Sequence, residues 1–195
     1  AAGRPDRFLG LHFFAPAHVQ PLVELAIGEN TAPEVEAAGL AFLRGLKKSP
    51  VRTTGSPGFV GNRILAAYRA AADGLLARGA SPYAVDAAMT EYGFKMGPSA
   101  ALDFSGLDVS SAFRARFAEQ RMDRAFPIAR CLMDEGRLGQ KSGRGFYIYD
   151  DSENPRAGRA DQVMLDLIAT LRAELGFAPR SVDASEIVET CLLAM

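Results

Sequence analysis

The sequence has few cysteines, almost no net charge and no long apolar run. Cys131 and Cys191 stand far apart in apolar surroundings, which favours reduced thiols over a disulfide framework, and two cysteines are too few for a structural zinc site. A net charge of −1 gives no bulk case for binding nucleic acid or a membrane surface. No apolar run approaches the roughly 20 residues of a membrane-spanning helix. The composition is that of an ordinary globular protein.

The dinucleotide-binding pattern G-x-G-x-x-G is also absent from the 195 residues. The glycines at positions 55, 58 and 61 are spaced G-x-x-G-x-x-G, so we interpret them as a turn between domains and not as a phosphate loop. A second glycine-rich stretch, 136–149, carries the cations Arg137, Lys141 and Arg144. These could reach phosphates, but a glycine turn that leads into an aromatic packing strand is the simpler interpretation.

The first 54 residues predict the order strand, strand, helix, strand. Apolar runs at 7–14 and 21–28 suit buried strands. The segment 33–48 opens with a proline and acidic residues and closes with two lysines, which is the charge order that a helix dipole favours. A short run rich in threonine and valine follows at 49–54. This order is typical of the tail of an α/β sheet.

Downstream of the glycine turn the pattern is almost entirely helical. Apolar residues at helical spacing predict a long helix over 59–78. Further predicted elements are helices at 82–92, 98–119, 124–135, 161–175 and 183–195, an extended aromatic run at 143–150 and a polar linker at 151–160. The predicted fold class is therefore an α/β tail followed by an all-α domain, mainly α overall.

His12 is the first candidate for chemistry. A histidine at the end of a strand is more often structural than catalytic. Glu24, however, lies on the adjacent apolar run, where it could meet His12 across the sheet. A buried carboxylate needs a partner, and such a pair would orient the imidazole as a general base. His18, in the connecting loop, is interpreted as a solvated residue.

Asn62 is the second candidate. It falls in the first turn of the long helix, where asparagine is a good capping residue. The alternative is an amide donor aimed at a carbonyl or alkoxide oxygen beside the positive end of the helix. The local sequence leaves both alternatives open.

Four motifs, taken in order, resemble those of L-3-hydroxyacyl-CoA dehydrogenases, most closely the form that is fused to an enoyl-CoA hydratase. They are HFFAPAHVQPLVEL, PGFVGNRIL, YGFKMGPSAALDFSGLDV and EGRLGQKSGRGFYIYD. The resemblance implies a Rossmann domain that holds NAD⁺ and a 3-hydroxyacyl-CoA substrate between that domain and the helical one. It implies NAD-dependent oxidation of the substrate in fatty-acid β-oxidation.

The resemblance also implies roles for five residues. His12 takes the proton of the 3-hydroxyl group, Glu24 steadies the resulting histidinium, and Asn62 lies on the substrate side. Lys141 lies near the cofactor. Ala15 replaces the usual asparagine or serine near the nicotinamide, which leaves a backbone contact there. No metal is expected.

The resemblance divides the chain into three parts. Residues 1–54 correspond to the end of the NAD-binding Rossmann domain, 55–150 to the C-terminal helical domain, and 151–195 to a linker and the start of a second helical copy. The phosphate-binding glycines, the ribose-binding acid and the active-site serine of the family have no counterpart. We therefore expect an excerpt from a longer protein, inactive by itself.

The expected partners are an acyl-CoA substrate and either a second copy of the chain or a thiolase subunit, with neither nucleic acid nor a membrane. The expected location is the cytoplasm, or the peroxisome in a eukaryote. Two alternatives remain: a non-catalytic module for dimerisation or packing, and a related dehydrogenase of 3-hydroxybutyryl-CoA or of a sugar acid.

Overall fold

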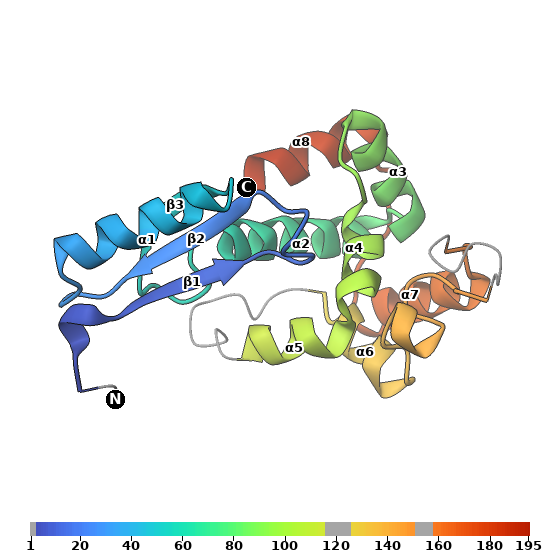
Figure 1. Cartoon of the computed structure of the whole chain (residues 1–195). Helices are drawn as coiled ribbons and strands as arrows, with labels where there is room; N and C mark the ends of the chain where they lie inside the picture. The colour runs from blue at the N-terminus through green and yellow to red at the C-terminus, as the bar shows by residue number, and fades with distance from the viewer. Residues whose placement is uncertain (1–2, 116–125, 151–157) are drawn as a thin grey trace. The chain divides into compact units, whose positions relative to one another are not determined.

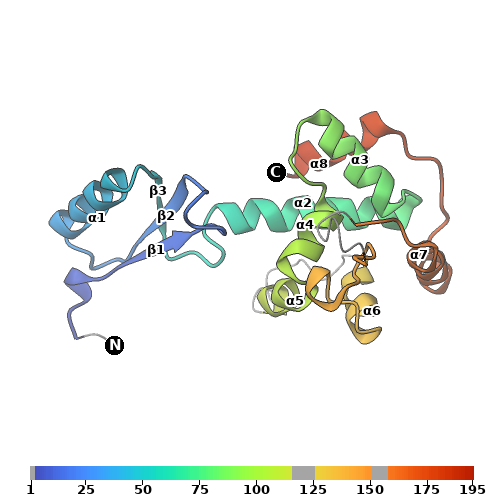
Figure 2. The same cartoon turned by 45° about the vertical axis from the view of Figure 1, so that its right-hand side comes forward.

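The computed structural model of the chain describes residues 3–115, 126–150 and 158–195. The chain divides into two compact units, Ala1–Ile64 and Leu65–Met195, whose elements are traced in Figures 1 and 2. Each unit has its own hydrophobic core. Within the described ranges, no helix is long and apolar enough to cross a membrane.

The first unit is a three-stranded sheet with one covering helix. After a short 3-10 turn, η1 (Pro5–Arg7), come β1 (Leu9–Phe13), β2 (Leu22–Ile27), α1 (Pro33–Gly45) and β3 (Ser49–Thr54). The strand order is β1-β2-β3, with β1 antiparallel and β3 parallel to β2. Helix α1 makes the crossover between the two parallel strands, as such a connection requires.

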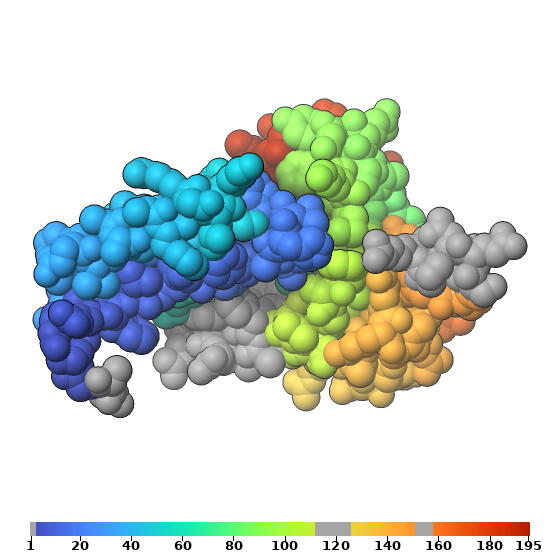
Figure 3. Space-filling model, in the orientation of Figure 1, coloured from blue at the N-terminus to red at the C-terminus, as the bar shows by residue number. Residues whose placement is uncertain are grey.

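The two faces of β2 differ in character. Val23, Leu25 and Ile27 point to one face, where they form a core with Leu43 of α1. Gly39 lets the helix approach closely, because a Cβ there would lie 3.2 Å from the Leu25 side chain. Helix α1 forms an outer surface of this unit, light blue to cyan in Figure 3. Side chains alternate along a strand, so Glu24 projects from the opposite face.

Two predicted helix boundaries are wrong for the same reason. The helix expected over 33–48 ends at Gly45, and Lys47 has a φ of 56°. The helix expected over 59–78 begins at Gly61, after Phe59 with a φ of 48°. Positive φ is incompatible with a right-handed helix, so each residue ends or delays it.

The second unit consists of helices joined by short turns. Helix α2 (Gly61–Arg78) begins in the first unit and continues into this one. The other elements are α3 (Pro82–Tyr92), α4 (Pro98–Ser105), α5 (Leu107–Ala115), α6 (Ile128–Asp134), η3 (Gln140–Ser142), α7 (Gln162–Glu174) and α8 (Ala184–Ala194). The predicted fold class, an α/β part followed by a helical part, is confirmed.

The last two helices belong to the core of the second unit. Met164 and Ile168 of α7 and Ile187 of α8 are buried in the same cluster as residues of α2 and α3. The guanidinium of Arg172 donates to the carbonyl oxygens of Leu76 and Ala80, both at 2.6 Å. Segment 158–195 is thus packed against the end of α2. Of the linker predicted at 151–160, residues 151–157 lie outside the described residues. Both cysteines are free.

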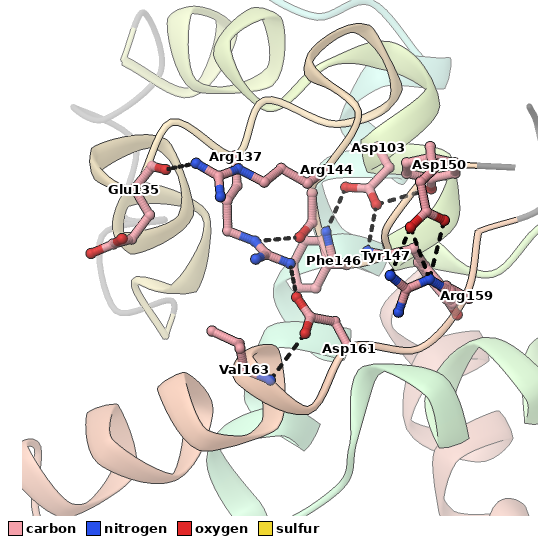
Figure 4. A network of polar contacts seen from close by, with 12 residues as sticks. Asp103, Glu135, Arg137, Arg144, Phe146, Tyr147, Asp150, Arg159, Asp161 and Val163 are labelled. Carbon is pink, nitrogen blue, oxygen red and sulfur yellow. Dashed lines mark hydrogen bonds and ion pairs between the residues drawn. The ribbon is translucent and has the colours of Figure 1, made fainter.

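A network of buried polar groups holds the second unit together (Figure 4). The carboxylate of Asp103, in α4, is 1% exposed and accepts the N–H groups of Phe146 and Tyr147, each at 2.9 Å. Arg137 donates to Asp161 at 2.5 Å and to the carbonyl of Gly145 at 2.8 Å. Burial raises the pKa of Asp103 to about 6, although the N–H groups of Tyr147 and Phe146 favour its charged form.

Other predicted elements in this unit need correction. The helix expected over 98–119 is broken into α4 and α5, because Gly106 has a φ of 91°, and its residues beyond 115 lie outside the described ranges. The helix expected over 124–135 begins only at Ile128, after Pro127, and 124–125 are likewise not described. The run 143–150 forms isolated bridges, between Arg144 and Ile148 among others, and no regular strand.

The Asp103 network generates a stability prediction. Replacing Asp103 by Asn puts an amide group among three donors, the N–H groups of Phe146 and Tyr147 and the hydroxyl of Tyr149. We therefore expect the free energy of unfolding of the second unit to fall by about 2–4 kcal/mol at pH 7. All five tyrosines lie in this unit, so tyrosine fluorescence during urea unfolding reports on it alone. Asp108→Asn, at an exposed ion pair, is the control and should change little. Equal effects of the two variants would contradict the prediction.

The raised pKa of Asp103 predicts a pH dependence. The folded state binds this proton more tightly than the unfolded chain, whose carboxyl has its ordinary pKa of 3.8. The stability from protonation is therefore complete below about pH 3.8 and is lost as the pH rises through about 6. On acidification from pH 7 to 5, the wild type should gain stability relative to Asp103→Asn. Urea titrations at both pH values measure the difference in free energy of unfolding between the wild type and Asp103→Asn. If that difference stays constant or shrinks on acidification, the prediction is refuted.

Candidate functional site

His12 and Glu24 form a pair on the face of the sheet opposite α1. They are register partners on the neighbouring strands β1 and β2. The ring nitrogen Nδ1 of His12 lies 2.6 Å from Oε2 of Glu24. The Glu24 side chain is 1% exposed, whereas the His12 side chain is 35% exposed. The pair therefore has a buried end and an end open to a reactant.

The other oxygen of Glu24 binds the backbone at the start of α2. Oε1 accepts the N–H of Val60 at 2.8 Å and the N–H of Gly61 at 2.7 Å. With His12, the carboxylate has three donors, which is the satisfaction that a buried charge requires. The first N–H groups of a helix have no partner within the helix, and here a side chain from β2 supplies one.

These contacts decide the charge of Glu24. Burial by itself would raise the pKa of its carboxyl, but the N–H of Gly61, the His12 ring and the N–H of Val60 together lower that pKa below its ordinary value. Glu24 is thus ionised at neutral pH, and its oxygens can only accept. Nδ1 of His12 must therefore carry a proton, which leaves Nε2 of the neutral ring as the basic atom.

Two aromatic rings fix the His12 ring from the sides. The ring centroids of Phe14 and Phe59 lie 4.9 and 5.8 Å from that of His12, at interplanar angles of 57° and 47°. Phe14 continues β1, and Phe59 comes from the turn before α2. These contacts and the Glu24 hydrogen bond leave the imidazole little rotational freedom.

The turn before α2 has an unusual backbone. Gly58 and Phe59 are both left-handed, with φ of 78° and 48°. A bulky residue at positive φ is a genuine outlier. The left-handed conformation of Gly58 and Phe59 directs the N–H groups of Val60 and Gly61 toward Glu24. The spacing of the glycines predicts a simple turn between domains but does not predict these two donors. The positions of Gly58 and Gly61 in PGFVG were the only signal.

Asn62 is the second residue of α2 and is half-buried. Because Glu24 accepts the N–H groups at the start of α2, the helix end has an acceptor other than the Asn62 side chain. Among the described residues, no hydrogen bond of the Asn62 amide is recorded. The geometry weakens the capping interpretation and leaves the amide free to meet a ligand.

The remaining predicted site residues are Lys141 and Ala15, and His18 was the other histidine considered. Lys141, in η3 of the second unit, donates to Asp108 at 2.5 Å. Ala15 and His18 are exposed residues of the loop between β1 and β2. The structure therefore pairs His12 with Glu24 and places Asn62 directly after Gly61, whose N–H binds Glu24, while Lys141 belongs to the second unit. Across the described part of the chain, no group of acidic, histidine or cysteine side chains could hold a metal.

Two family models match the chain. The 3-hydroxyacyl-CoA dehydrogenase NAD binding domain matches residues 1–56, and the 3-hydroxyacyl-CoA dehydrogenase C-terminal domain matches residues 58–149.

The curated relatives are larger proteins. A peroxisomal bifunctional enzyme of Danio rerio is 36% identical over 98% of this chain, and the fatty acid oxidation complex subunit alpha of Acinetobacter baylyi is 34% identical over 100% of this chain. The chain spans 28% of the length of each.

Solved structures agree with this assignment. The dehydrogenase part of multifunctional enzyme 1 from C. elegans is 29% identical, with a TM-score of 0.70, over 94% of this chain and 41% of that one. The (S)-3-hydroxybutyryl-CoA dehydrogenase of Ralstonia eutropha is 38% identical, with a TM-score of 0.69, over 75% of this chain and 53% of that one. The family resemblance predicted from the four motifs is confirmed, and the chain belongs to the 3-hydroxyacyl-CoA dehydrogenase family.

Proposed function

We propose that the chain provides the catalytic base of an NAD-dependent L-3-hydroxyacyl-CoA dehydrogenase. The observation that carries this proposal is the pair of a half-exposed His12 and a buried, ionised Glu24. Nε2 of His12 accepts the proton of the 3-hydroxyl group. When bound, NAD⁺ supplies the acceptor for the hydride that leaves C3. The product is the 3-oxoacyl-CoA.

Glu24 acts on the proton transfer through His12. The ring becomes a cation when it accepts the substrate proton, and the adjacent carboxylate stabilises that cation. The two N–H groups on Oε1 keep Glu24 ionised, so that the proton stays on His12. The Asn62 amide is proposed to donate to the substrate oxygen, which gains carbonyl character as the hydride leaves.

The residues present fit the reacting end of the cofactor and not its phosphates. An imidazole that contacts two aromatic rings and is paired with Glu24 suits the oxidation of an alcohol next to a nicotinamide. The 195 residues contain no G-x-G-x-x-G unit for the pyrophosphate. We therefore propose that the activity belongs to a longer protein, in which Lys141 and the backbone of Ala15 lie near the cofactor.

The names of the relatives suggest the setting of this reaction. They include a bifunctional enzyme and the alpha subunit of a fatty acid oxidation complex. We propose that this chain is the dehydrogenase part of a similar multifunctional protein, with acyl-CoA as substrate and a thiolase subunit or second copy as partner. A peroxisomal location is proposed only by analogy with the relative of that name.

A short-chain dehydrogenase is the second candidate. It is favoured by the 38% identity to a 3-hydroxybutyryl-CoA dehydrogenase. The two candidates differ in how kcat/KM changes with acyl length. A steep fall beyond four carbons indicates the short-chain enzyme, whereas a flat or rising profile indicates the fatty-acid enzyme.

His12→Ala tests the catalytic role. In the full-length protein, loss of a general base should lower kcat by about 10²–10⁴-fold. The readout is NADH consumption with acetoacetyl-CoA. His18→Ala is the matched control, because His18 is exposed and is the only other histidine. Near-normal turnover of His12→Ala would show that the base lies elsewhere.

The 195-residue chain alone should bind NADH too weakly for turnover. The reason is the absence of the glycine-rich phosphate loop, which supplies much of the dinucleotide contact. The same assay, at saturating acetoacetyl-CoA, should show no rate above a blank without protein. Steady NADH consumption would mean that these residues bind the cofactor without that loop.

A further inference from the structure

We propose that Gly61 is a positioning residue of the His12 site, which it controls through Glu24 and Phe14. This inference rests on the function proposed for His12. Its basis is the set of contacts around the Gly61 backbone and the space where a side chain would stand.

The first contact is the hydrogen bond to Glu24. The N–H of Gly61 lies 2.7 Å from Oε1, and the N–H of Val60 lies 2.8 Å from the same atom. Two converging donors fix this oxygen in place, and because the carboxylate is rigid and planar, they also fix Oε2. Oε2 is the atom that holds Nδ1 of His12. A displacement of the Gly61 backbone is therefore transmitted to the imidazole.

The second contact depends on the missing side chain. A Cβ at position 61 would lie 2.7 Å from Cζ and 3.0 Å from Cε1 of Phe14, and 3.6 Å from Oε1 of Glu24. Distances below 3.0 Å force one of the groups to move. The Phe14 ring lies against His12, with centroids 4.9 Å apart. A methyl group at position 61 would thus force either the Phe14 ring or the Gly61 backbone, which holds Glu24, to move.

The same turn sets the position of Asn62. Gly58 and Phe59, with positive φ, direct the chain so that the N–H groups of residues 60 and 61 converge on Glu24. Asn62 follows directly in the first turn of α2. The Glu24 carboxylate therefore links the proton acceptor, His12, to the proposed oxygen-binding amide, Asn62. Both groups are positioned by one buried charge.

The test uses NMR of the histidine rings in the 195-residue chain. Only two histidines are present, and exposed His18 serves as an internal reference. In the wild type, the Nδ1 proton of His12 should give a low-field signal, because the carboxylate protects it from exchange. We expect Gly61→Ala to abolish that signal while the His18 ring is unchanged. Retention of the His12 signal in Gly61→Ala overturns the proposal.

Two further variants separate positioning from folding. Gly55→Ala is the matched control, since a Cβ there has nothing within 4 Å, and it should keep the His12 signal. Phe14→Leu removes the ring atoms that the new methyl would meet. If steric displacement is the cause, Phe14→Leu combined with Gly61→Ala should restore the signal, including where Gly61→Ala alone folds poorly. A folded double variant without the signal counts against the proposal.

The kinetic consequence is measured in the full-length protein. Misplacement of a base should lower kcat on the order of 10²-fold in Gly61→Ala, with little change in KM for the acyl-CoA. Gly55→Ala should keep the wild-type kcat. The NMR result needs neither substrate nor cofactor, so it stands or falls independently of the proposed dehydrogenase reaction. An unchanged kcat in Gly61→Ala would overturn the positioning role in an otherwise active enzyme.

Discussion

The buried carboxylate of Glu24 joins the sheet of the first unit to the start of α2. A carboxylate that is 1% exposed loses its hydration, and only hydrogen bonds from fixed donors can replace it. Three donors do so: the ring of His12 and the N–H groups of Val60 and Gly61. The left-handed turn at 58–59 and the packing of Phe14 and Phe59 around the imidazole follow from the need to bring these donors together.

The sequence was sufficient to predict one half of this arrangement. His12 and Glu24 lie on consecutive apolar runs with a short connection, so pairing across an antiparallel ladder could be anticipated. The other half consists of the N–H groups of Val60 and Gly61, which lie more than 35 positions from Glu24 in the sequence. These are backbone groups, so the residue types do not reveal them. Phe59 at positive φ could not be foreseen either, because a phenylalanine next to apolar residues predicts a helix or strand. Such a conformation is determined by the tertiary contacts that it satisfies.

The same limits apply to the second unit. Periodicity located α2, α3, α7 and α8 to within a few residues, since each has an apolar face that a core must cover. It did not detect the break at Gly106, because glycine is compatible with several backbone conformations. The resemblance, and not periodicity, predicts that 151–195 contain a linker and the start of a second helical copy. In the structure, residues of α7 and α8 are buried in the same core as residues of α2 and α3. The polar composition of a loop carries no information on what packs beyond it.

In the described part of the chain, the buried carboxylates of Asp86 and Asp103 are satisfied in the same way as that of Glu24. Asp86 accepts the N–H groups of Ser99 and Ala100, at the start of α4, and Asp103 accepts those of Phe146 and Tyr147. A glycine without room for a Cβ lies beside each carboxylate: Gly61, Gly97 and Gly145. Two adjacent backbone donors therefore recur as the means of holding a buried acid.

Glu24 differs from Asp86 and Asp103 in the third donor to its carboxylate, which adds to the two backbone N–H groups. Tyr147 completes Asp86 and Tyr149 completes Asp103, and burial raises the pKa of both carboxyls. His12 completes Glu24, and the pKa of that carboxyl is lowered despite its burial. A phenol donates a hydrogen bond but does not become a cation, whereas an imidazole can take up a proton and remain paired. Because the His12 side chain is also 35% exposed, a common structural device has at this site the properties of a proton acceptor.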